Sequence, residues 1–292
     1  MSTYTVDGLA LDHPLGLWYL EKGTGRRAIP ARRGINVALA GRAGELPMPR
    51  EDLEPTVLPF TFNVRGRRPD GRPGTEADLE RNMEALIALL MPPHRLVDLR
   101  HHIGEGMIRQ ADAKFNAGSE PELLAGANAI RLTMAARIPG VFWRDVAAAT
   151  WSGGRLDGWS YVATPLSGCS GEITDALIRV TGPAGDDIVV NDLASGGSVV
   201  ADVDLSGGER LLIDCGRMRA AVVDTDTWDL ADGQDVTGLI DSTGPGSAYR
   251  WLHLTPSIYG HDAHSRLIQV GGTAPGTSGA TRLAIRARRA YL

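Results

Sequence analysis

The sequence of 292 residues has little cysteine, little lysine and no long apolar run. Its two cysteines, Cys169 and Cys215, cannot build a disulfide framework, so the fold must be held by packing. No window reaches the roughly 20 apolar residues that span a membrane. The N-terminus has neither the basic start nor the apolar core of a signal peptide. We therefore expect a soluble protein of a bacterial-type cytosol, without a membrane anchor.

Positive charge is scarce in the second half of the chain. Residues 1–150 carry 19 basic and 18 acidic side chains, whereas residues 151–292 carry 11 and 17, so the halves sit at +1 and −6. A nucleic-acid-binding module needs a basic stripe that neutralises phosphates. The acidic second half argues against such a module.

Recognisable catalytic motifs are missing as well. No G-x-S-x-G elbow offers a seat for a nucleophilic serine. Ser167, Cys169 and Ser170 crowd together between glycines, but no base lies near them in sequence, so we interpret them as turn residues. The glycine pattern at Gly23–Ala28 resembles a dinucleotide fingerprint, yet Pro30 leaves no room for the helix that this motif requires. The sequence predicts no enzyme and no cofactor.

Two histidine-rich stretches are the candidates for a metal site. Neither has the H-E-x-x-H spacing of a zinc protease, and no cysteine joins either group. The group near the C-terminus is the better candidate because His261, Asp262 and His264 could share one loop tip. A surface loop with solvated histidines is the simpler interpretation, and a metalloenzyme is our third hypothesis. The two groups are His101, His102 and Glu105, and His253, His261, Asp262 and His264.

Turn-forming residues are abundant: 36 glycines and 17 prolines favour many short strands. One strong helix interrupts them at Thr75–Leu90, with Thr75 as its N-cap, Asp78 three residues later and Pro92 after its end. Its apolar stripe comprises Leu79, Met83, Leu86, Ile87 and Leu90. Two strands are predicted after the helix, in HRLVDLRHHI and in GANAIRLTMAARIPGVFWRD, and the second has a period-two face at Ile130, Leu132, Met134, Ala136 and Ile138.

The composition changes at residues 147–159, which we interpret as a linker between domains 1–150 and 151–292. After it, about eight short strands separated by turn signals predict a β-sandwich or jelly roll. The stretch LSGGERLLIDCGRMRA, Leu205–Ala220, first looks like a site because it holds Glu209, Asp214 and Cys215. In one strand, however, residues five apart point to opposite faces, so the two acids cannot act as a pair. The thiol is then a buried apolar group with Leu211 and Ile213.

The order of these motifs resembles the distal tail proteins of siphophages, often described as minor tail proteins. In the second half the resemblance lies in L-x-x-G-E-x-L-x-I-D at Leu205–Asp214, WLHLTP at Trp251–Pro256, RLIQVGG and the final TRLAIRARRAYL. In the first half it lies in YTVDGLAL, the single helix with LERNMEALIALL, its proline stop and GVFWRD. The loops Gly66–Gly74 and Thr237–Ala248 depart from the family pattern, which leaves the contacts between neighbours open.

The resemblance implies a mainly β fold with one principal α-helix. It implies an N-terminal ring-forming domain and a C-terminal β-sandwich that is galectin-like or similar to a carbohydrate-binding module. It also implies a virion protein at the tail tip, assembled in the host cytoplasm as a homo-oligomer, expected to be a hexamer. Its expected partners are the tail tube protein, the tape measure protein, the baseplate hub or tail-associated protein and receptor-binding proteins, while DNA passes through the lumen without specific binding.

A carbohydrate-binding module or lectin for host cell-surface glycans is the alternative hypothesis. β-Sandwiches often carry aromatic platforms for sugars, and four aromatic residues lie in or beside predicted loops. For Trp228 and Trp251, burial in the sandwich core is the simpler interpretation. The four residues are Trp228, Tyr249, Trp251 and Tyr259.

Overall fold

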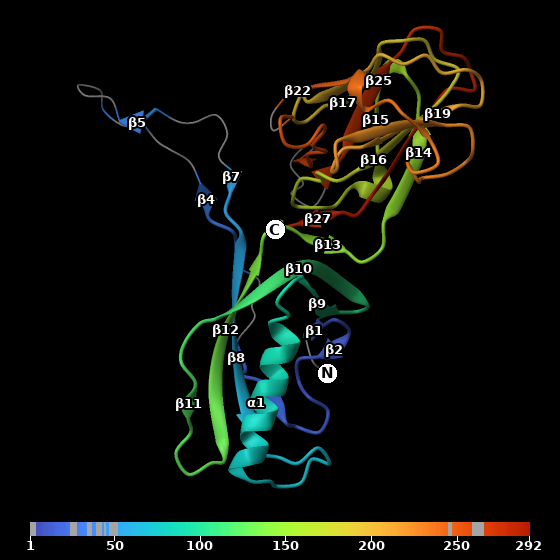
Figure 1. Ribbon diagram of the computed structural model, residues 1–292. Coiled ribbons are helices and arrows are strands. Elements are labelled where there is room, and N and C mark those ends of the chain that lie inside the picture. The colour runs from blue at the N-terminus through green and yellow to red at the C-terminus, as the bar shows by residue number, and fades with distance from the viewer. Residues whose placement is uncertain are drawn as a thin grey trace. The chain divides into compact units, whose positions relative to one another are not determined.

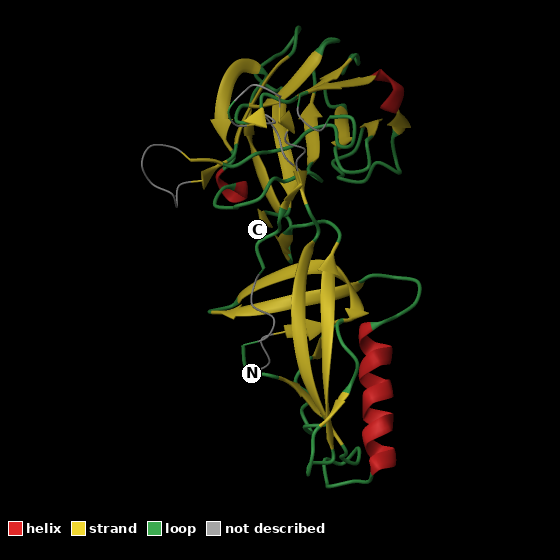
Figure 2. Ribbon diagram, turned by 90° about the vertical axis from the view of Figure 1, so that its left-hand side faces the viewer, coloured by secondary structure: helices red, strands yellow, loops and turns green. Residues whose placement is uncertain are grey.

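The computed structural model describes residues 4–23, 28–33, 37–38, 43, 45–46, 52–244, 247–258 and 266–292. The chain divides into two compact units, Met1–Trp143 and Arg144–Tyr291, with Leu292 grouped with the first. The architecture is mainly β with one α-helix, as predicted, and the second unit is of the β-sandwich type (Figures 1 and 2). Within the described residues no helix has the length and apolar character to cross a membrane.

The first unit is one antiparallel sheet with the strand order β2-β1-β9-β10-β12-β8-β3. Shorter ladders join β4 to β7 and β5 to β6, and β11 pairs with β12. The elements are β1 (Tyr4–Val6), β2 (Leu9–Ala10), β3 (Trp18–Leu20), β4 (Arg32–Arg33), β5 (Val37–Ala38), β6 (Glu45–Leu46), β7 (Asp52–Leu53), β8 (Thr56–Arg65), α1 (Glu76–Leu90), β9 (Val97–Gly104), β10 (Met107–Ala117), β11 (Glu122–Leu123) and β12 (Ala129–Ile138).

Aromatic contacts show that this sheet curls. Tyr4 of β1 meets Phe60 of β8 edge to face, with ring centroids 5.0 Å apart, although β9, β10 and β12 lie between the two strands. Phe115 of β10 lies 5.7 Å from Phe60 in the same core. The predicted inward face of β12 is confirmed, because Ile130, Leu132, Met134, Ala136 and Ile138 are all buried. Burial also raises the pKa of the Tyr4 hydroxyl to about 12.

Helix α1 lies alongside the long strands of the same unit (Figure 2). Leu79, Leu86 and Leu90 are buried, as the apolar stripe predicts, while Met83 and Ile87 are half-buried. Thr75 caps the helix and forms a capping box with Asp78, which confirms the predicted start. Asp78 receives the backbone N–H and the hydroxyl of Thr75, and these bonds lower the pKa of its carboxyl group.

The second unit consists mainly of two antiparallel sheets, with strand orders β14-β26-β16-β19-β20-β21 and β15-β25-β17-β18-β22. The elements are β13 (Trp143–Asp145), β14 (Ala149–Gly154), β15 (Asp157–Val162), η1 (Thr164–Leu166), β16 (Leu177–Thr181), β17 (Ile188–Asp192), β18 (Ser198–Ala201), β19 (Arg210–Asp214), β20 (Arg219–Val223), β21 (Gln234–Asp235), η2 (Thr237–Leu239), β22 (Ile240–Thr243), β23 (Ser257–Ile258), β24 (Arg266–Leu267), β25 (Gln269–Thr273), β26 (Arg282–Ala287) and β27 (Ala290–Tyr291). Strand β13 begins at Trp143, the last residue of the first unit before the boundary.

Alternation along the strands of the second unit gives each sheet a buried face. Ile178 of β16 lies opposite both Ile213 of β19 and Ile285 of β26, and all three are at most 1% exposed. On the other sheet, Val190 and Val199 are buried in the same way. Burying such branched side chains between two sheets is the main stabilising contribution of a sandwich.

Two sequence interpretations of the second unit were wrong. The segment 147–159, predicted to be a linker, contains β14 and the start of β15. Its glycines have structural reasons of their own: Gly154 packs against Trp151, where an added Cβ would lie 2.7 Å from the ring. The segment Thr237–Ala248, predicted to be a loop, contains η2 and β22, which pairs with β18.

Candidate functional site

The arginine loop, defined here as Gly66–Gly74 between β8 and α1, is an ordered feature of the first unit. It folds back on itself as a small hairpin: Arg68 N–H donates to the Arg72 carbonyl at 2.9 Å, and Gly71 N–H donates to the Arg68 carbonyl at 2.8 Å. Gly71 has a φ of +84°, a conformation that glycine adopts without strain. Asp70 accepts from Arg72 N–H at 3.0 Å, which is the usual stabilising contact of an aspartate in a turn.

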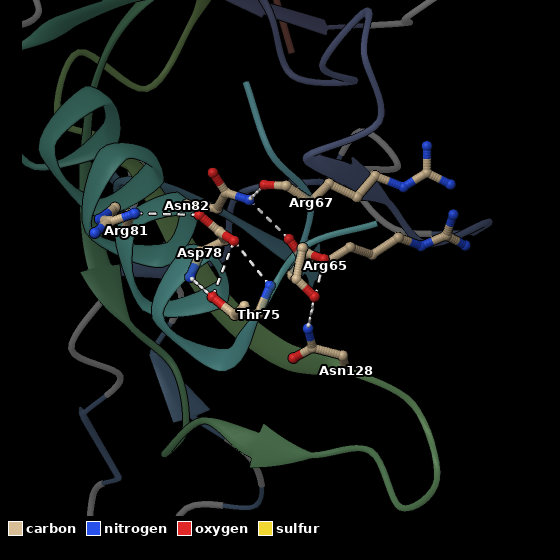
Figure 3. Close-up of polar contacts among 9 residues, drawn as sticks. Arg65, Arg67, Thr75, Asp78, Arg81, Asn82 and Asn128 are labelled. Atoms are coloured by element: carbon tan, nitrogen blue, oxygen red, sulfur yellow. Dashed lines mark hydrogen bonds and ion pairs between the residues drawn. The ribbon is translucent and has the colours of Figure 1, made fainter. Parts of the chain in front are cut away.

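Two asparagines clamp both ends of the arginine loop (Figure 3). Asn82, buried on α1, donates its side-chain amide to the carbonyls of Arg65 and Arg67, each at 2.8 Å. Asn128 donates to the carbonyls of Gly66 and Gly74 at 3.4 and 3.1 Å. An added Cβ at Gly66 would lie 2.0 Å from the Asn128 amide nitrogen, so a larger residue there would displace the Asn128 side chain from its contacts. The loop is therefore fixed through its main chain.

The side chains of the arginine loop remain available to other molecules. Arg68 is exposed, and the Arg72 side chain is 79% exposed with Asp70 3.6 Å away. Arg67 donates to the Gly71 carbonyl at 3.2 Å, which leaves its charge uncompensated in that contact. A fixed loop loses little conformational entropy on binding. These arginines are thus suited to contact an acidic surface of a partner.

The outer edge of β8 is a second surface suited to assembly. Among the described strands, only β3 pairs with this edge, and it covers Phe62–Val64. The Thr61 carbonyl accepts from the Glu21 N–H, and the Arg65 N–H donates to the Leu17 carbonyl, so the main chain of both residues points toward that side. By period two, Val57 and Pro59 face the same way. Val57 is 48% exposed, and Pro59 carries no N–H, a device that limits uncontrolled pairing of strand edges.

The predicted aromatic platform is divided between core and surface. Trp251 is 6% exposed and belongs to the core, so its ring offers no open face. Tyr249 is 82% exposed. Trp228 is half-buried, and the guanidinium of Arg179 lies 4.4 Å from its ring centroid, covering one face. Tyr259 lies outside the described residues.

Sequence reasoning missed one exposed aromatic residue. Trp159 of β15 is 73% exposed, although its segment had been interpreted as a linker. The alternation of Trp159 and Tyr161 after Gly158 was the signal that could have revealed a strand with outward aromatic residues. Val162 on the same strand is 38% exposed.

The predicted metal ligands of the first group do not converge. His101 and His102 are consecutive on β9 and point to opposite faces: His101 stacks on Tyr4 at 4.3 Å, and His102 meets the Thr5 hydroxyl at 3.3 Å. Glu105 lies in the turn after them with a φ of +50°. Among the described residues no group of three or more histidine, cysteine, aspartate or glutamate side chains could hold a metal ion.

In the second group, only His253 is described, and its Nδ1 lies 2.9 Å from a Glu172 carboxylate oxygen. His261, Asp262 and His264 lie outside the described residues, as do positions 24–27 of the glycine pattern. The serine and cysteine cluster is structural. Ser167 accepts from Ile268 N–H at 3.1 Å and donates to the Ala163 carbonyl, while Cys169 is fully buried.

The stretch Leu205–Ala220 contains β19 and the turn that follows it. Leu211, Ile213 and Cys215 are buried, as strand geometry predicts. Glu209 lies in the turn before β19, where it accepts from Ser206 N–H at 2.7 Å, whereas Asp214 is the last residue of the strand. Asp214 accepts from Arg217 N–H at 2.8 Å. The two acids are therefore separate turn and strand-end residues, not an acid/base pair.

Comparison with known proteins gives a likeness of fold over the whole chain. No family model and no curated protein sequence matches this chain. The crystal structure of the Dit protein of phage SPP1 matches with a TM-score of 0.64 and 15% identity over 99% of both chains. Two structures of the phage P2 baseplate, in its activated conformation with Ca and with Sr, match at 10% identity over 94% of this chain and 91% of theirs, with TM-scores of 0.38 and 0.36. The chain thus has the fold of the SPP1 Dit protein.

Proposed function

We propose that this protein is a structural component of the hub at the distal end of a long, non-contractile phage tail, and not an enzyme. The observation that carries the proposal is the match over 99% of both chains to SPP1 Dit, which is described as a paradigm of the hub of the adsorption apparatus in phages that infect Gram-positive bacteria. Fold alone does not determine function, so the surfaces of this chain must supply further support.

Two features of the first unit support self-assembly into a ring. Beyond β3, no described strand pairs with the outer edge of β8, where Pro59 offers a carbonyl but no N–H to a neighbouring strand. The arginine loop, whose main chain is fixed, presents exposed cationic side chains. A ring requires two different complementary surfaces on each copy. We propose a hexamer built on these two surfaces.

The proposed ring joins the tail tube and tape measure protein to the baseplate hub or tail-associated protein and to receptor-binding proteins. It is located at the virion tail tip and assembles in the host cytoplasm. DNA would pass through the lumen without specific binding.

The test is the mass of the full chain in solution, measured by size-exclusion chromatography with light scattering and by negative-stain imaging. We expect rings of six copies. The double variant Arg68→Glu, Arg72→Glu should weaken the ring without unfolding the chain, because neither side chain is buried. Arg155→Glu, an exposed charge reversal in the second unit, is the matched control. A strict monomer at high concentration, with no rings in the images, would overturn the proposal.

Binding of host cell-surface glycans is the second candidate function, and exposed aromatic rings favour it. Tyr249 is open to solvent, and Trp228 is held in place by Arg179. Aromatic faces that are fixed before binding suit sugar stacking. We expect Tyr249→Ala and Trp228→Ala to abolish binding to a glycan array, and Trp159→Ala, another exposed ring, to retain it. No glycan binding by the full chain would refute this alternative.

A further inference from the structure

The second unit contains an open pocket of about 540 Å³ at one end of its six-stranded sheet. β14 and β16 begin there, and β19 and β26 end there. Four arginines and two aspartates line the pocket, and the other lining residues are apolar or glycine. The charged residues are Asp175, Asp214, Arg217, Arg250, Arg286 and Arg288.

The strand register explains how residues distant in sequence meet in this pocket. Leu177 of β16 lies opposite both Asp214 of β19 and Arg286 of β26. Residues directly opposite each other project from the same face of a sheet. Their neighbours Ile178, Ile213 and Ile285 are buried, so Leu177, Asp214 and Arg286 project from the outer face.

Among the residues that the structure describes, the pocket lining carries more positive than negative charge, even though Arg217 lies 3.8 Å from Asp214. Asp175 lies between Arg144 at 2.5 Å and Arg288 at 3.8 Å. Arg250 donates to the Gly216 carbonyl at 2.9 Å, a bond that leaves its charge uncompensated. The Arg286 side chain makes no hydrogen bond or ion pair with any residue that the structure describes. Four arginines against two aspartates leave a charge of +2 in a half of the chain that carries −6 overall.

The pKa of the neighbouring Arg144 is affected by the charges of these arginines. Burial lowers the pKa of its guanidinium, Asp175 opposes that shift, and the like charges of Arg288 and Arg250 lower the pKa further. Mutual repulsion among arginines is relieved when an anion binds between them. The cluster therefore favours an anionic ligand on electrostatic grounds as well as by shape.

The pocket selects the size and the chemistry of such a ligand. Its volume lies in the range of roughly 300–1,000 Å³ that small-molecule sites occupy. A charge of +2, surrounded by an acidic domain, matches a group with one or two negative charges and not a polyanion such as DNA. Guanidinium groups recognise carboxylate or phosphate, while Asp175 and Asp214 can accept hydrogen bonds from hydroxyl groups. An acidic peptide offers few hydroxyl groups to these aspartates.

We propose that this pocket binds an acidic sugar, meaning a saccharide that carries a carboxylate or phosphate group. The arginines bind the anionic group, and the two aspartates bind the ring hydroxyls. The proposed aromatic platform contributes no residue to this pocket. The inference rests neither on that platform nor on the tail-hub function.

Titration calorimetry of the full chain tests the proposal with four probes: glucuronic acid, glucose 1-phosphate, glucose and inorganic phosphate. We expect at least one acidic sugar to bind more tightly than inorganic phosphate, with affinity that falls as salt is added, and we expect no binding of glucose. Equal affinity for inorganic phosphate would overturn sugar recognition. Tighter binding of glutarate, added as a fifth probe, would indicate an acidic peptide instead. No binding of any probe at millimolar concentration would overturn the site.

The variant Arg286→Gln locates the binding. This side chain is exposed and makes no internal bond among the described residues, so the fold should be kept. We expect affinity for the acidic sugar to fall about tenfold or more, as for the loss of one charge-assisted contact. Arg282→Gln is the matched control, because Arg282 lies on the same strand and face but outside the pocket. Equal effects of the two variants would overturn the assignment.

Discussion

Removing the Asn82 side chain tests whether main-chain clamping fixes the arginine loop. Asn82→Ala deletes two hydrogen bonds of 2.8 Å to the carbonyls of Arg65 and Arg67. Each contributes about 0.5–1.5 kcal/mol, which gives a loss of about 1–3 kcal/mol. The higher helix propensity of alanine returns about 0.6 kcal/mol. We therefore expect a net decrease of about 0.5–2.5 kcal/mol in the free energy of unfolding, measured by urea denaturation.

Hydrogen–deuterium exchange of the peptide covering residues 66–75 provides the local readout. In the variant, the amides of Gly71 and Gly74, which donate within the loop, should exchange faster. Asn82→Asp keeps the shape but removes the donor, so it should be at least as destabilising as alanine. Glu84→Ala, on the exposed side of the same helix, is the control and should change stability by less than about 0.5 kcal/mol. If Asn82→Ala matches that control and loop exchange is unchanged, the clamp argument is refuted.

Three further predictions concern the core, the thiols and the dependence of stability on pH in the acidic range. Ile213→Ala should lower the free energy of unfolding, measured by urea denaturation, by about 2–5 kcal/mol, and Ile213→Asp should unfold the second unit. Glu209→Ala removes one turn hydrogen bond and should lower it by about 1 kcal/mol or less. Similar losses at both positions would contradict the strand assignment. Burial raises the pKa of both Cys169 and Cys215, so neither should react with iodoacetamide at pH 8 until urea unfolds the chain, and rapid labelling of the native protein would contradict their placement. The Arg95 contact at 2.6 Å lowers the pKa of Asp7 below its ordinary value of 3.8, so this pair stabilises the protein above that pH. The contribution is lost as the pH falls through the folded-state pKa. Asp7→Asn, which tolerates the φ of +49°, should lower the urea midpoint at pH 6 but not at pH 2.5, and an equal difference at both pH values would rule out this ionisation as the cause.

Periodicity predicted the elements whose buried side chains are large. The face of β12 and the stripe of α1 were both correct because leucine, isoleucine and methionine stand at regular spacing. β10, an eleven-residue strand, was not predicted. Its inward positions include Ala111 and Ala113, which give almost no hydrophobic contrast with the polar residues between them. Small inward residues are sufficient there because Phe115 and its aromatic neighbours fill the core.

The candidate sites were less predictable because they depend on long-range register. Strand geometry predicted that Glu209 and Asp214 do not act as a pair, but it could not show which residues surround Asp214. The structure places Asp214 in a pocket with Arg286, which lies 72 residues later in the sequence. Asn82 was likewise invisible: a polar residue on a helical stripe has no sequence signal for the two carbonyls that it binds.

The clamp on the arginine loop separates the shape of the loop from its chemistry. Asn82 and Asn128 bind only main-chain carbonyls, and those carbonyls are present whichever side chains residues 68 and 72 carry. Substitutions at these positions can therefore alter what the loop recognises while its path is retained. In the proposed ring, such a frame would allow one contact surface to change partners by point mutation, without a new fold and without a new loop length.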